Sequence, residues 1–100
     1  METFDFEDGN GPVPAHKHVY GGGWVANTTY VSKTAYVGPD ARVYDSARVY
    51  GYARVFGSAQ VSGSAQVSGN TRVSGYARVS GSAQMSGNTR VCGYAWVSGD

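Results

Sequence analysis

Two histidines flank a lysine near the start of the chain, in the segment His16-Lys17-His18. Side chains two residues apart in an extended segment project to the same side, so His16 and His18 could act together. Two imidazoles at this spacing are suited to binding a metal ion or to forming an acid/base pair. We predict neither a metal ligand nor a catalytic residue here. We expect a capping segment that covers the first coil and offers these three side chains as candidate ligand-binding residues.

A second candidate site consists of arginines that recur every eighteen residues, at Arg54, Arg72 and Arg90. His18 and Tyr36 precede them at the same spacing. If a coil takes eighteen residues, the arginines stack about 5 Å apart, and three cations in register repel one another. An anion would relieve that repulsion, either a phosphate group or the acidic start of the chain. The alternative is that the guanidinium groups are solvated while their stems cover the sheet.

Aromatic residues mark a candidate interface. One group follows valine in three successive repeats and forms a belt around one coil, whereas a second group lies near the end of the sequence. Large exposed aromatic side chains that gather in one place are typical of contact surfaces. The predicted interface residues are Trp24, Tyr44, Tyr50, Phe56, Tyr76, Tyr94 and Trp96.

A six-residue repeat positions all these candidates. Every valine, from Val13 to Val97, falls on one residue in six, and Met85 fills the remaining position of that series. An Ala or Thr precedes most of these positions by two residues, and a Gly follows each from residue 51 onward by two. Alternate residues of a strand share a face, so the small residue and the valine point inward. Glycine tolerates positive φ, which allows a sharp turn after each short strand.

Three such repeats make one coil. Residues 51–55 (GYARV) align at a spacing of eighteen with residues 69–73 and 87–91, which both read GNTRV. Strands too short to be stable alone can stack in register, with coils about 4.8 Å apart. We predict an all-β, three-sided solenoid of four to five coils over residues 23–100, preceded by an acidic tail and capping segment over residues 1–22.

The unit resembles the hexapeptide repeat of left-handed β-helix proteins. In that repeat an aliphatic residue is followed four positions later by a small one, as Val43 is by Ala47 and Val55 by Ala59. The resemblance extends over residues 23–99 and implies a left-handed parallel β-helix, which in this family commonly packs side by side as a trimer. Residues 13–18 (VPAHKH) and 21–25 (GGGWV) also resemble the start of small hexapeptide-repeat proteins of bacteria and their phages.

This scaffold is shared by proteins of several functions. The γ-class carbonic anhydrases gather three histidines, whereas this chain has two, and the family's acyltransferases interrupt their coils with a loop that is absent here. We therefore predict a non-enzymatic oligomeric structural or binding module without a cofactor, phage-encoded and engaging a host protein or an anionic small molecule. Two alternatives stay open: a CoA-dependent acyltransferase with a site between subunits, and a nucleotide-binding decoy or inhibitor of a host defence system.

Cysteine content and hydrophobic patterning indicate the cellular compartment and argue against a membrane partner. The single cysteine, Cys92, excludes an intrachain disulfide, and no stretch approaches the ~20 apolar residues of a membrane span. We expect a cytoplasmic protein, in the host cytoplasm if a phage encodes it, with no membrane partner. We expect a homo-oligomer, either a trimer that uses the aromatic belt (Tyr44, Tyr50 and Phe56), as the resemblance implies, or an end-to-end assembly through the last coil.

Charge is distributed unevenly along the chain. Glu2, Asp5, Glu7 and Asp8 make the first nine residues acidic, whereas residues 10–100 carry eight Lys or Arg against three Asp. This excess is too modest to predict nonspecific binding to nucleic acid. We expect the acidic tail to be frayed and solvated. The alternative is that it folds back on the basic body or docks on a partner.

Overall fold

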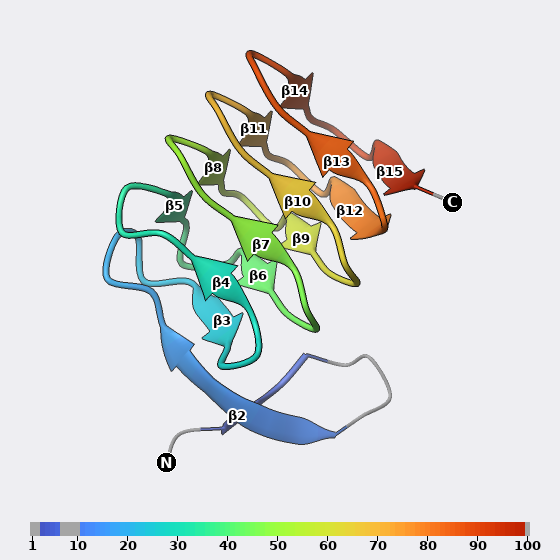
Figure 1. The fold of residues 1–100 in the computed structure, drawn as a ribbon. Coiled ribbons are helices and arrows are strands. Elements are labelled where there is room, and N and C mark those ends of the chain that lie inside the picture. The colour runs from blue at the N-terminus through green and yellow to red at the C-terminus, as the bar shows by residue number, and fades with distance from the viewer. Residues whose placement is uncertain (1–2, 7–10, 100) are drawn as a thin grey trace.

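The chain forms a three-sided β-solenoid. The computed structural model describes residues 3–6 and 11–99, and every regular element in them is a β-strand. Four complete coils stack between β3 (Trp24–Ala26) and β15 (Trp96–Gly99), as Figure 1 shows. Among these described residues there is no helix that could cross a membrane.

The strands belong to three sheets, one on each side of the solenoid. The first sheet has the order β1 (Thr3–Asp5), β2 (Pro12–Lys17), β3, β6 (Arg42–Val43), β9 (Gln60–Val61), β12 (Arg78–Gly81) and β15. The second sheet contains β4 (Tyr30–Val31), β7 (Arg48–Val49), β10 (Gln66–Val67) and β13 (Gln84–Met85). The third sheet contains β5 (Tyr36–Val37), β8 (Arg54–Val55), β11 (Arg72–Val73) and β14 (Arg90–Val91).

Neighbouring coils are parallel and in register at eighteen residues. Arg72 lies between Arg54 and Arg90, and Val73 lies between Val55 and Val91. The backbone amide of Arg54 donates to the Thr71 carbonyl at 2.9 Å, so each coil is hydrogen bonded to the next. The eighteen-residue coil and the number of coils are confirmed. The left-handed sense of winding stays a prediction.

The core is a narrow column of valine and alanine. Val43, Val61 and Val79 are completely buried, as are the alanines of the central coils. Thr71 takes an alanine position because its hydroxyl donates to the Ser68 carbonyl at 2.6 Å, which satisfies a buried polar group. The six-residue pattern is misleading at Val19, which is 80% exposed because it lies before the first coil.

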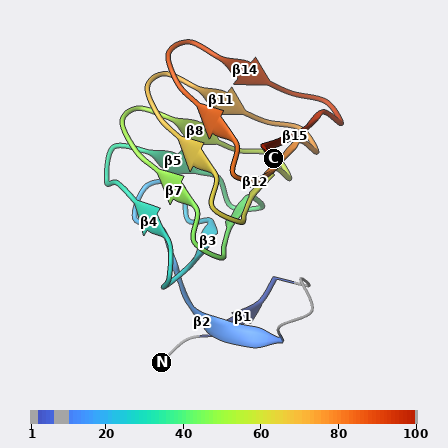
Figure 2. The same ribbon diagram turned by 45° about the vertical axis from the view of Figure 1, so that its right-hand side comes forward.

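The N-terminal segment folds back on the solenoid. Strand β1 pairs antiparallel with β2, and β2 pairs antiparallel with β3, so this hairpin extends the first sheet at one end of the stack (Figure 2). The expectation of a frayed terminus is wrong for Thr3–Phe6, because Phe4 and Phe6 find apolar partners on the body. The acidic residues Glu2, Glu7 and Asp8 lie outside the described residues.

Corner glycines allow the coils to approach one another closely. Gly69 and Gly87 occupy the same corner in successive coils, with φ of 68° and 69°. A Cβ on Gly69 would lie 2.7 Å from the Gly87 backbone nitrogen, whereas a Cβ on Gly87 would meet nothing within 4 Å. Glycine is therefore required at Gly69 by stacking as well as by backbone conformation, and at Gly87 by backbone conformation alone.

We predict that Gly69→Ala destabilises the fold more than Gly87→Ala. Both variants place a Cβ at a left-handed φ, which costs about 1–2 kcal/mol. Only Gly69→Ala also forces two coils apart, which adds roughly 1–3 kcal/mol as overpacking does. Urea unfolding followed by circular dichroism measures the difference. Equal losses in the two variants would show that contact between stacked corners does not limit the residue type.

Candidate functional site

The predicted arginine column lies on the third sheet. Tyr36 pairs with Arg54, and Arg54, Arg72 and Arg90 follow in register, so the four side chains share one face. All three arginines are exposed. Together with corner residues of the same coils they line a groove of about 430 Å³. The lining residues are Tyr52, Arg54, Asn70, Arg72, Asn88 and Arg90.

The groove concentrates positive charge. Within the described part of the chain, no carboxylate pairs with Arg54, Arg72 or Arg90. At the strand spacing of roughly 5 Å, neighbouring unit charges repel by about 1 kcal/mol in bulk water. Beside the arginines, the Asn70 Nδ2 donates to Asn88 Oδ1 at 3.3 Å. The groove therefore offers several hydrogen-bond donors in a line, which suits a ligand with several anionic oxygens.

His18 does not extend the arginine column. It is buried, and its Nε2 donates to the Ala35 carbonyl at 2.8 Å. The column begins at Tyr36, because β5 is the first strand of the third sheet. His18 therefore stabilises the fold, since its hydrogen bond links the segment before the first coil to Ala35, the residue that precedes β5 of the third sheet.

The three residues of the His16-Lys17-His18 segment are not brought together. The Nδ1 of His16 is 2.6 Å from Asn27 Oδ1, on the exposed side of the hairpin. The Nζ of Lys17 lies 5.7 Å from the centre of the Trp24 ring. In the described residues, no group of three His, Cys, Asp or Glu is close enough to hold a metal ion.

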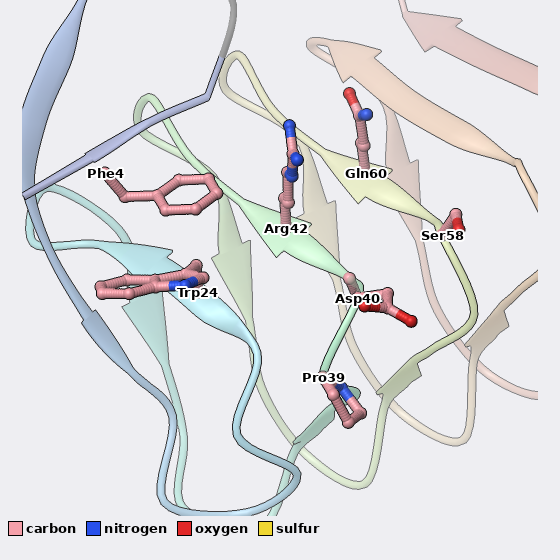
Figure 3. A pocket seen from close by; sticks show the side chains of 8 residues that line it. Phe4, Trp24, Pro39, Asp40, Arg42, Ser58 and Gln60 are labelled. Carbon is pink, nitrogen blue, oxygen red and sulfur yellow. The ribbon is translucent and has the colours of Figure 1, made fainter.

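The hairpin covers two of the predicted interface residues. The Phe4 ring stacks on Trp24 at a centroid distance of 4.9 Å, and Phe6 stacks on Tyr44 at 5.0 Å. The Arg42 guanidinium lies 5.0 Å from the Phe4 ring centre, and a cleft of about 500 Å³ opens beside Phe4 and Trp24 (Figure 3). Trp24 and Tyr44 therefore serve packing within the chain.

The other predicted interface residues remain on the surface. Tyr50 and Phe56 are about one-third exposed. Tyr76 and Tyr94 stack in parallel at 5.1 Å, and the Arg78 guanidinium lies 5.1 Å from the centre of the Trp96 ring. Tyr94 is 79% and Trp96 72% exposed. The second aromatic group, Tyr76, Tyr94 and Trp96, is thus more exposed than Tyr50 and Phe56.

An aromatic pocket beside the arginine column was not predicted. Tyr20, Tyr36, Arg54 and Phe56 line a cavity of about 240 Å³ next to the basic groove. The eighteen-residue register already places Tyr36 beside Arg54. Tyr20, however, comes from the irregular segment before the first coil, and a repeat pattern carries no information about its position.

Comparison with known proteins supports the repeat. Residues 47–63 and 65–82 match the family described as "YdcK Beta solenoid repeat". These segments fall within the stacked coils, so this chain contains β-solenoid repeats. Neither the curated proteins nor the solved structures include a significant match to the chain.

We predict that Phe4→Ala exposes Trp24. Trp24 is the only tryptophan in a Trp96→Phe background, so its fluorescence reports on the contact with the hairpin. Loss of the stacked ring, worth about 0.5–1.5 kcal/mol, should shift the emission to longer wavelength and increase quenching by acrylamide. The control is Tyr30→Ala, which removes an exposed ring from the second sheet and should leave the fluorescence of Trp24 unchanged. Unchanged quenching after Phe4→Ala would contradict the packing described.

Proposed function

We propose that this chain is a non-enzymatic binding module whose third sheet captures an anion. The observation that carries this proposal is the row of three exposed arginines in one groove, without a carboxylate partner among the described residues. Arginine binds phosphate or carboxylate oxygens with paired, charge-assisted hydrogen bonds. A bound anion would also remove the repulsion within the column. The nucleotide-binding decoy is the alternative that uses this same site.

An acyltransferase is less well supported by the geometry. Such an enzyme would use His16 or His18 as a base, close to a polar partner from a neighbouring subunit. His18 is buried and hydrogen bonded to a backbone carbonyl, and His16 is already hydrogen bonded to Asn27 of its own chain. Both rings therefore have structural partners. These contacts favour the binding module over the enzyme.

We predict that inorganic tripolyphosphate binds the protein at low ionic strength. Arg72→Gln should weaken this binding roughly tenfold to a hundredfold, which is the range expected when hydrogen bonds to a charged group are lost. Gln is tolerated at this position of the repeat, since Gln60 and Gln66 occupy it on the other two sheets. Titration calorimetry provides the affinities.

The matched control is Arg48→Gln on the second sheet, which removes the same charge outside the groove. Its affinity for tripolyphosphate should stay close to that of the original protein. Equal weakening in both variants would mean that net charge, and not the groove, attracts the anion. Absence of measurable binding to the original protein would refute the proposed function.

We also propose that the chain self-associates through its second aromatic group, Tyr76, Tyr94 and Trp96. Exposed stacked rings bury large apolar area when a second copy covers them. Side-by-side packing as a trimer is the arrangement we propose.

This association predicts a mass above the 10.5 kDa of one chain in light scattering. The double variant Tyr94→Ser and Trp96→Gln should lower that mass, because it removes two exposed rings from the proposed interface. The variant should keep the fold, since Ser58 and Gln60 occupy these two positions two coils earlier. Tyr30→Gln removes an exposed ring from the second sheet and should leave the mass unchanged. A monomeric original protein would contradict the proposed association.

A further inference from the structure

We propose that the ligand of the basic groove is a nucleoside phosphate, with its base in the aromatic pocket and its phosphates along the arginine column. This inference rests on the proposed capture of an anion and identifies its chemical class. It is carried by a second cavity, of different chemistry, that adjoins the groove.

The aromatic pocket has three ring walls. Tyr20 and Tyr36 meet edge to face, with centroids 4.9 Å apart and an interplanar angle of 83°. Phe56 forms the third wall and is 37% exposed. Residue 38, one coil before Phe56, is glycine, and a Cβ there would lie 3.1 Å from the Phe56 Cβ. A larger residue at this position would crowd the wall that Phe56 provides.

Arg54 lines both cavities, so the aromatic pocket and the basic groove are adjacent. The register orders the side chains along the sheet as Tyr36, Arg54, Arg72 and Arg90. The site is therefore aromatic at one end and cationic along the rest. From Arg54 to Arg90 is two coil spacings, or about 10 Å, so a ligand that uses both parts is elongated.

A nucleoside phosphate has the matching chemistry. Its flat base can stack on aromatic side chains, which contributes about 1–3 kcal/mol per base. Its phosphate oxygens accept hydrogen bonds from arginine. Inorganic phosphates would use only the arginines and leave the aromatic pocket empty. The presence of two adjacent cavities that share Arg54 thus favours a ligand with one flat apolar end and one anionic end.

The test compares inorganic tripolyphosphate with the four common ribonucleoside triphosphates by titration calorimetry, without divalent metal. At least one nucleotide should bind roughly tenfold tighter than tripolyphosphate, as expected from one stacked base. Phe56→Ser should abolish this advantage while leaving the affinity for tripolyphosphate unchanged. Serine is accepted at this position one coil later, as Ser74.

The control is Tyr50→Ser, which removes an aromatic side chain at the equivalent position on the second sheet and should preserve the advantage. Circular dichroism establishes that each variant is folded. Should Phe56→Ser fail to fold, Tyr20→Ala removes a wall of the pocket from outside the coils and should also abolish the advantage.

The outcomes separate the two proposals. If tripolyphosphate binds as tightly as every nucleotide, the assignment of a nucleoside phosphate is overturned while anion capture stands. If nucleotides bind tighter but Phe56→Ser and Tyr20→Ala leave that advantage intact, the assignment is also overturned. If tripolyphosphate does not bind, both proposals fail, whether or not a nucleotide binds.

Discussion

The structure depends on hydrogen bonds between parallel coils that are held in register at eighteen residues. Strands of two to four residues cannot be stable alone, so each coil needs the backbone of the next one. This constraint keeps the core narrow, because the side chains inside a coil must fit those directly above and below. Valine and alanine satisfy it over most of the stack, Met85 takes one valine position, and threonine takes an alanine position at Thr71 through its hydroxyl. Glycine at the corners satisfies it where backbones approach most closely.

The same register also creates the surface chemistry. A residue type that recurs at eighteen residues becomes a continuous column, whatever its charge. Arg54, Arg72 and Arg90 thus form a line of cations that no isolated strand would assemble. Aromatic residues break the pattern at Tyr36 and Phe56, and these departures give the column an apolar end. Regular positions hold the fold together, whereas the irregular ones make one stretch of the surface different from the others.

The period of the sequence accounts for most of what could be predicted. Valines at one residue in six and an eighteen-residue match are enough to predict the three sheets, the inward faces and the arginine register. The N-terminal hairpin could not be predicted in this way, because its antiparallel pairing has no period. The stacking of Phe4 on Trp24 and the burial of His18 depend on that hairpin and on the turn that follows it. The aromatic pocket was missed because Tyr20 comes from this turn.

The central claim is that three stacked arginines act as one anion-binding site. Nuclear magnetic resonance of the arginine Nε–Hε groups, recorded during a titration with tripolyphosphate, tests it most directly. The account predicts that the signals of Arg54, Arg72 and Arg90 shift together along one binding curve while that of Arg48 stays in place. Equal shifts of Arg48 and the column, or no shift of the three column arginines, would contradict it.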